Sequence, residues 1–376
     1  MLQYVLAGLA LGAIYAIASA GLVVTFESAG VLNFAFGSMA YVVARFYYWF
    51  NSQHGWSTVT AGLMSILVVA PLLGVVLYNV LFRFIRDKST LIKLVTTIGL
   101  SVALPPVANF FLGTETIDSA QGLALQSDRP FHFLGAPVTT NQIVTYGFLV
   151  LILAMGTLII RATGVGLKVR AVVDSEAMSS LSGTHPGRVA LGVWAASSTM
   201  AGIAGILVAP AVGLTTMGMT TLMVAAFAAV VGARLRSLPA AVVVALAMGV
   251  VTDVIQKYLP PNSALTADIV PSVPFAVMLI FLVVYVVRAG RIVEHSGTGG
   301  PLDRAIRPAG DAALHAGEAQ ISTTLRSRLL SAVPLVVVAA LPLIFHGSPY
   351  WLGLVALGAC YAIAFLTFTV VTGEGG

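Results

Sequence analysis

The sequence predicts an all-α fold, a polytopic bundle of transmembrane helices, on the evidence of three observations. Hydrophobic residues make up 58% of the 376 residues and charged residues only 9%, whereas about a quarter of a soluble domain is charged. The apolar residues gather in runs that mostly suffice to cross a hydrocarbon core of roughly 30 Å at about 1.5 Å per residue. The runs lack the alternation of a β-barrel, and lipid offers no partner to an open sheet edge.

Eleven apolar runs are expected to form the helices. The first begins at Tyr4 without a basic segment before it or a cleavage site after it, and we interpret it as a retained helix. The run 218–232 is short and lies among glycines, which predicts a half-helix beside an internal cavity. In chain order the runs cover residues 4–26, 30–50, 59–82, 91–112, 142–160, 189–211, 218–232, 239–258, 271–287, 330–345 and 351–372.

The orientation follows from where the basic residues fall. Loop 113–141 holds three acidic residues and one arginine, and it separates the basic stretches around Arg83 and Arg170. If each run crosses once, every basic stretch up to Arg288 lies on one side, which is the cytoplasmic side by the positive-inside rule. The sequence therefore predicts a multi-pass protein of the bacterial inner (plasma) membrane with its N-terminus outside. Because the basic residues are scattered over short loops, the net charge of +5 indicates topology and no nucleic-acid partner.

The chain is expected to contain one break and one repeat. Apolar character disappears over residues 289–329, which we interpret as a cytoplasmic linker rich in Gly, Pro and Ser. Residues 10–18 and 356–364 differ at one position, and both helices are predicted to run in the same direction, as in a parallel repeat. We therefore expect a first permease-like module at 1–288 with about 8–9 spans, and the truncated start of a second at 330–376 with about two.

Five stretches of the sequence form a recognisable set of motifs: Gly8–Ile17, Gly30–Gly37, Thr96–Ser101, Arg170–Ala177 with Gly183, and Ala201–Gly205. Together they resemble the branched-chain amino acid ABC permeases of the high-affinity Liv type, and the tail from Ser348 looks like the start of their partner permease. The resemblance covers roughly residues 1–290 and implies a fused pair. It implies an importer that works by alternating access, with ATP bound by separate ATPase subunits and no cofactor in this chain. The implied partners are ABC ATPases, a second permease module, an extracytoplasmic solute-binding protein and membrane lipid.

One stretch departs from the family pattern. After Gly232 the family continues with a glycine-rich turn, and here residues 233–239 stand in its place. The solute therefore stays open between branched-chain amino acids and small polar compounds such as amides or urea. For the path of the solute we name Tyr15, Asn33 and Thr97; for Asn33 a simple interhelical hydrogen bond is an equal alternative.

A short amphipathic helix is predicted over residues 174–183, between two spans. Asp174 or Ser175 can cap its start, and Gly183 followed by Pro186 can stop it. Its apolar face repeats every four residues, at Val173, Ala177 and Leu181.

In an ABC permease such a helix docks on the ATPase subunit, and we assign this one as the coupling helix. Arg170, Asp174 and Glu176 are the expected rim contacts, Ala177 and Leu181 the docked face, and Gly183 the end of the helix. The alternative is a helix lying on lipid. Its acidic residues argue against that alternative, because anionic headgroups attract Lys and Arg.

Other residue patterns limit the remaining classes of function. The sequence has no G-x-x-x-x-G-K-[ST], G-x-S-x-G or H-E-x-x-H motif, so neither an ATPase nor a hydrolase of these kinds is predicted. The six histidines have no metal-ligand spacing, and no metal site is expected. An ion-coupled secondary transporter is the alternative function, but such proteins place charges at mid-membrane, where these runs hold few.

Two further expectations concern packing and isolated charges. Gly8 and Gly12 form a small-xxx-small pair that we expect to allow close helix packing, and Gly202 with Ile206, beside Gly205, suggests the same only weakly. The ionisable residues within the runs lie near predicted helix ends, so we expect them to reach towards water: Glu27, Arg45 and Asp253.

Overall fold

The computed structural model describes most of the first 289 residues. Undescribed are residues 30–31, 86–87, 89, 116, 118–119, 125–130, 134, 235–236, 261–262 and, apart from Gly358, everything from 290 onward. The chain divides into two compact units, Met1–Ala305 and Ile306–Gly376. The predicted linker and second module thus lie almost entirely outside the described residues, and they stay predictions.

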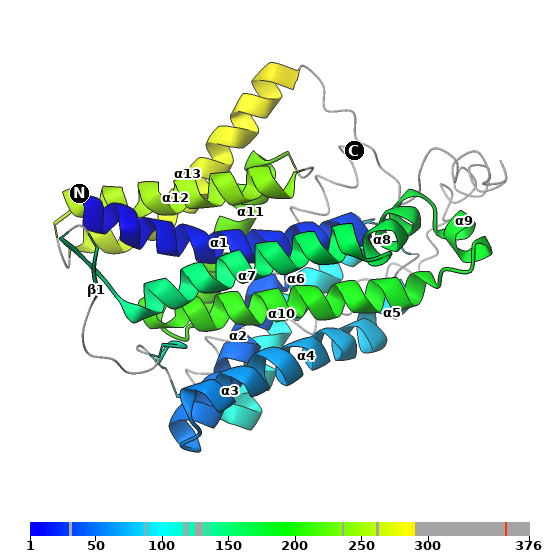
Figure 1. Cartoon of the computed structure of the whole chain (residues 1–376), viewed down its shortest axis with the longest axis horizontal. Helices are drawn as coiled ribbons and strands as arrows, with labels where there is room; N and C mark the ends of the chain where they lie inside the picture. The colour runs from blue at the N-terminus through cyan, green and yellow to red at the C-terminus, as the bar shows by residue number, and fades with distance from the viewer. Residues whose placement is uncertain are drawn as a thin grey trace, which may run out of the picture. The chain divides into compact units, whose positions relative to one another are not determined.

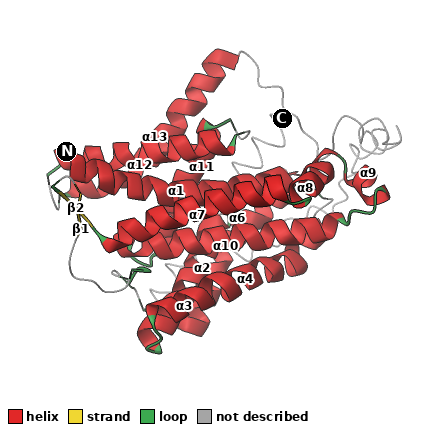
Figure 2. Ribbon diagram, in the orientation of Figure 1, coloured by secondary structure: helices red, strands yellow, loops and turns green. Residues whose placement is uncertain are grey.

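The described residues form helices almost throughout (Figures 1 and 2). Three π-helical turns, η1 Trp49–Gln53, η2 Ser65–Val69 and η3 Tyr78–Phe82, lie between α2 and α5. One antiparallel hairpin joins β1 Phe131–Phe133 to β2 Ala136–Val138. The α-helices are α1 Leu2–Ala29, α2 Phe36–Tyr48, α3 Thr58–Met64, α4 Ala70–Leu77, α5 Arg83–Ile85, α6 Thr90–Leu112, α7 Thr140–Ala162, α8 Val165–Asp174, α9 Glu176–Leu181, α10 Pro186–Val212, α11 Thr216–Gly232, α12 Leu238–Tyr258 and α13 Ala264–Ala289.

Seven helical segments of the described part are long and apolar enough to cross a membrane. The all-α, polytopic prediction is therefore confirmed, while the number of crossings stays a prediction. α11 has 17 residues, so it extends about 25 Å at the usual rise and is shorter than a full span. The segments are Leu2–Phe26, Thr58–Ile85, Leu91–Leu112, Thr140–Ile159, Pro186–Val212, Leu238–Tyr258 and Asp268–Tyr285.

Burial separates central helices from peripheral ones. In the apolar windows of α1 and α10, 78% and 67% of the residues are buried, against 6% in α7 and 11% in α13. α1 packs directly against α12, α10, α11 and α7, and Figure 1 shows α1 in blue near the middle of the view. Many Leu, Val and Phe side chains of α7 and α13 are exposed, and hydrating so much apolar surface is unfavourable. We therefore assign these two helices to the lipid-facing surface.

Close packing at glycines sets the distance between the central helices. A Cβ added to Gly8 would lie 2.6 Å from the Val250 Cα, and one added to Gly12 would lie 2.7 Å from the Leu246 Cα, both on α12. The packing role expected for Gly8 and Gly12 is therefore confirmed. Gly205 of α10 approaches α2 just as closely, with an added Cβ 2.6 Å from the Ala40 carbonyl oxygen, so α10 uses its glycines more than the sequence suggested.

α2 differs from the predicted run 30–50. It begins only at Phe36, because the side-chain Oδ1 of Asn33 accepts a hydrogen bond from the Ala35 N–H at 3.0 Å and bends the chain there. Its ten residues 36–45 are all buried, so the helix meets protein on every side. Polar side chains on such a helix must find partners inside the bundle.

Arg45 is the clearest correction to the expectations for charged residues. Its side chain is 0% exposed, so it does not reach towards water. Its guanidinium donates to the carbonyl oxygens of Glu115 at 2.9 Å and of Gly113 at 2.6 Å, just beyond α6. Asp253 is half-buried on α12, and the side chain of Glu27 is not described.

Candidate functional site

The candidate site is the helical connection between α7 and α10. It consists of α8 and α9, which lie at the end of the bundle opposite the N-terminus (Figure 1). The β1–β2 hairpin lies at the N-terminal end (Figure 2). α9 therefore lies at the end of the bundle that the sequence predicts to be cytoplasmic, if each apolar run crosses the membrane once.

The ends of α9 are fixed by residues of its own sequence. Ser175 caps the start, accepting a hydrogen bond from the Met178 N–H at 3.2 Å. Gly183 has φ +80° and ends the helix in the left-handed conformation. The Gly183 N–H donates to the Ser180 carbonyl and the Thr184 N–H to the Ser179 carbonyl, each at 3.0 Å, which is a Schellman motif. α9 is thus a well-defined single unit.

The two faces of α9 have opposite character. Ser175 and Ser179 are buried, at 6% and 4% exposure, on the side towards the bundle. Met178 and Leu181, three residues apart on one face, are exposed by 50% and 82%. Among its described side chains, α9 therefore buries Ser179 and exposes Met178 and Leu181 together with Ser180, so two apolar side chains face outwards.

The predicted helix 174–183 needs correction at its start and end. The structure has two helices, since Ser175 is extended with φ −159° and ψ 113° and separates α8 from α9. Asp174 belongs to the end of α8, Ser175 is the cap, and α9 stops at Leu181. The sequence reasoning missed α8, although Val165, Val169 and Val172 are spaced four and three residues apart, as on one helix face.

Part of the coupling assignment falls on side chains that the structure does not describe. The backbones of Arg170, Asp174, Glu176 and Ala177 lie in α8 and α9, but their side chains are outside the described set. Their roles as rim contacts and docked face stay predictions. Leu181 is described, and its 82% exposure leaves it accessible to a partner.

The three proposed path residues are placed separately. Asn33 is 1% exposed and uses its amide locally, through the Ala35 N–H and a 3.4 Å contact from Nδ2 to the Met39 Sδ. Thr97 is 3% exposed, and its Oγ1 donates to the Leu94 carbonyl of its own helix at 2.8 Å. Tyr15 is buried within α1. These contacts of Asn33 and Thr97 are local, so the role of the three residues in the solute path stays a prediction.

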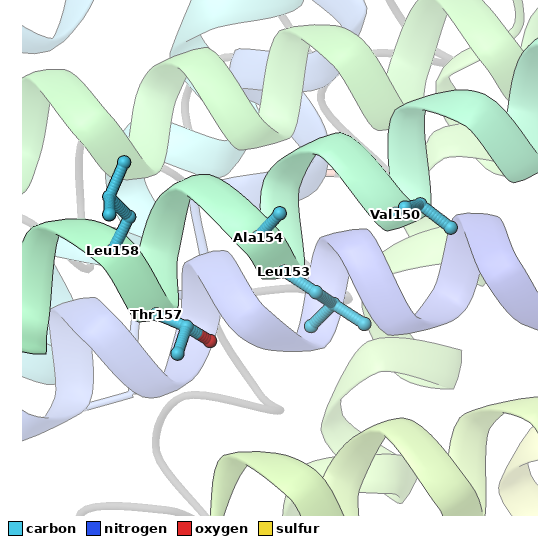
Figure 3. A pocket seen from close by; sticks show the side chains of 5 residues that line it. All are labelled: Val150, Leu153, Ala154, Thr157 and Leu158. Atoms are coloured by element: carbon cyan, nitrogen blue, oxygen red, sulfur yellow. The ribbon is translucent and has the colours of Figure 1, made fainter.

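An open groove of about 550 Å³ runs along α7. Figure 3 shows that its side chains come from one helix at helical spacing, with Thr157 the polar member. Such a groove suits an apolar partner rather than a polar solute. It is lined by Val150, Leu153, Ala154, Thr157 and Leu158.

A bundle with several helices long and apolar enough to cross a membrane is typical of the class of multi-pass membrane transport permeases. The chain belongs to the family described as "Branched-chain amino acid transport system / permease component", whose model matches residues 4–287. It is the permease subunit of an ABC importer, a multi-pass membrane protein. The alternative of an ion-coupled transporter is accordingly not supported.

Curated relatives show the same similarity. The chain is 26% identical over 297 residues to the high-affinity branched-chain amino acid transport system permease protein LivH of Escherichia coli K12, covering 75% of this chain and 93% of LivH. It is 24% identical over 261 residues to the permease protein BraD of Pseudomonas aeruginosa, covering 66% and 84%. Among solved structures, PsaBC from Streptococcus pneumoniae in complex with Fab has a TM-score of 0.44 and 14% identity, covering 73% and 90%.

Proposed function

We propose that the chain forms the transmembrane path for branched-chain amino acids or a related small polar solute such as an amide or urea. The observation that carries the proposal is the family match over residues 4–287, joined by relatives whose names specify branched-chain amino acids. A neutral zwitterion also suits a bundle in which the buried guanidinium of Arg45 already donates to two carbonyl oxygens.

Energy enters, in this proposal, through α9. Met178 and Leu181 form an exposed apolar pair on a short, capped helix. Burying this pair against a partner protein lowers the free energy, so the pair favours docking. ABC ATPase subunits on the cytoplasmic face are the proposed partners, and they bind the ATP. Their closure moves α9 and reopens the path on the opposite side, which is alternating access.

Two further partners complete the proposed importer. An extracytoplasmic binding protein delivers the solute and provides most of its recognition, because few polar groups within the described bundle are free to select it. A second permease module, encoded at least in part after residue 330 or on another chain, forms the other half of the path.

Uptake by the assembled importer tests the proposed solute. Cells expressing the permease with its binding protein and ATPases should accumulate labelled leucine, and an excess of isoleucine or valine should abolish the accumulation. Urea and acetamide should be tested as competitors in the same assay, because competition by them would indicate that the solute is an amide or urea and not a branched-chain amino acid. Uptake of a sugar or a metal ion, without competition by any of these solutes, would refute the proposal.

A further inference from the structure

Helix α6 contains two consecutive prolines, Pro105 and Pro106, inside its length. Proline has no N–H, so the helix cannot supply the usual hydrogen bonds to the carbonyl oxygens four residues earlier. These are the carbonyls of Ser101 and Val102. In a membrane an unpaired carbonyl is costly, because no water replaces the missing donor.

A side chain from another helix replaces one of the missing donors. The Ser38 Oγ on α2 donates to the Ser101 carbonyl oxygen at 2.6 Å. Ser38 is only 7% exposed and Pro105 is buried, so the bond forms inside the protein. Ser38 thus compensates, from α2, for the N–H that Pro105 lacks.

Beyond the prolines, the C-terminal part of α6 is tied to the same face of α2. The Tyr41 hydroxyl donates to the Asn109 Oδ1 at 2.6 Å, and Arg45 donates to the Gly113 carbonyl oxygen at 2.6 Å. Ser38, Tyr41 and Arg45 are spaced three and four residues apart, which places them on one side of α2.

Before the prolines, the hydroxyls of α6 turn back on their own helix. Thr97 donates to Leu94 at 2.8 Å, and the Ser101 Oγ donates to Ile98 at 2.7 Å. Gly99 has open space where a side chain would stand. The Pro105–Pro106 pair is therefore the point at which α6 loses two internal hydrogen bonds, and hydrogen bonds from Ser38, Tyr41 and Arg45 of α2 reach Ser101 and the residues beyond it.

We propose that α6 pivots where Pro105–Pro106 remove its internal hydrogen bonds during the transport cycle, and that Ser38 is the positioning residue that holds the pivot at Ser101 by its hydrogen bond. The part of α6 from Ser101 onward stays with α2, and the part before Ser101 swings. Bending at this point breaks no intrahelical hydrogen bond to Ser101 or Val102, because the prolines have already removed them.

A double-mutant cycle tests the hydrogen-bond replacement. Ser38→Ala alone should lower the midpoint of thermal unfolding of the purified permease by about 2–4 °C, since it leaves the Ser101 carbonyl unpaired. In a Pro105→Ala background the new alanine supplies the N–H, so the same substitution should have little effect. Ser19→Ala is the control, because Ser19 is also buried but donates to the Ala16 carbonyl of its own helix at 2.9 Å. Equal effects of Ser38→Ala in both backgrounds would refute the claim that the Ser38 hydroxyl replaces the N–H that Pro105 lacks.

Transport turnover separates a pivot from a purely structural bond. Pro105→Ala should leave the unfolding midpoint unchanged or higher, because alanine is the better helix former. It should nevertheless slow ATP-coupled turnover of the assembled complex about fivefold or more, since a continuous helix resists bending. A purely structural role for the proline predicts wild-type turnover, and that result would overturn the pivot.

Spin-label distances give a second readout that needs no solute. After replacement of the single cysteine, Cys360, labels at exposed Val95 and Ile159 follow the part of α6 before the prolines relative to α7. Labels at exposed Phe110 and Ile143 follow the part after them. Trapping the ATPases with ATP and vanadate should change the first distance only, and Pro105→Ala should remove that change. An unchanged first distance in the wild type would refute the pivot.

Discussion

Arg45 shows how a positive charge can be stable in the interior of this bundle. Its partners are two backbone carbonyl oxygens just after the C-terminus of α6. That end of a helix carries roughly half a negative charge from the aligned peptide dipoles, so a cation there is stabilised without a carboxylate. The Nε atom is buried without a hydrogen bond, and the Tyr48 ring lies 6.0 Å from the guanidinium carbon.

Replacing Arg45 should therefore loosen the segment after α6. Arg45→Met removes two charge-assisted hydrogen bonds and should lower the free energy of unfolding by about 1.5–3 kcal/mol. Hydrogen exchange should also become faster at the amides of residues 120–124. Once the Arg45 bonds to Gly113 and Glu115 are lost, this segment is held to α2 by the 2.7 Å hydrogen bond from the Tyr47 hydroxyl to the Gly122 carbonyl. Arg83→Met, which removes an equal charge from an exposed position, is the control.

Arg45→Lys gives the complementary comparison. A lysine keeps the charge but lacks the forked donors, so it should recover only part of the lost stability. Exchange rates at residues 120–124 that stay at the wild-type value in Arg45→Met would contradict the proposed anchoring role.

Among the elements, α9 offers the most direct test of the coupling hypothesis. Leu181→Asp places a charge on its exposed apolar face, and covering that charge in a docked contact costs roughly 1–3 kcal/mol. Since 1.4 kcal/mol is tenfold in affinity, the ATPase subunits should bind the purified permease about 5- to 150-fold more weakly. Retention of the ATPases on immobilised permease measures the effect.

The control for α9 is Leu181→Met, which keeps an apolar side chain of similar size and should retain the ATPases. If α9 instead lay on lipid, Leu181→Asp would disturb membrane contact and leave the ATPases bound. Unchanged retention together with unchanged coupled turnover would therefore decide against docking.

At the scale of the whole molecule, the orientation of the bundle is a prediction that reporters can check. The segment 120–124 and the β1–β2 hairpin follow α6, while α9 and the N-terminus lie at opposite ends of the bundle (Figure 1). A reporter that is active only outside the cell should work when inserted near Gln121 and stay inactive near Gly300. Equal activity at both positions would overturn the positive-inside argument.

The sequence by itself determined the class of fold and much of the candidate site. Lipid requires each spanning segment to be apolar and helical over its own length, so the spans could be located from local composition. The ends of α9 were also local, because Ser175 and Gly183 act on their own neighbouring backbone. The Liv-type motifs, such as Gly8–Ile17, supported the family that the match over residues 4–287 then established.

The tertiary structure alone decided which faces meet lipid and which polar groups meet each other. With 58% hydrophobic residues, lipid-facing and protein-facing sides of a helix look alike in sequence, so the complete burial of residues 36–45 in α2 could not be predicted. Arg45 was expected to reach water for the same reason, since its partners follow it by about 70 residues in the chain. The Ser38 bond to the carbonyl freed by Pro105 likewise joins residues 63 apart. Only the packing of α2 against α6 brings such groups within hydrogen-bond distance.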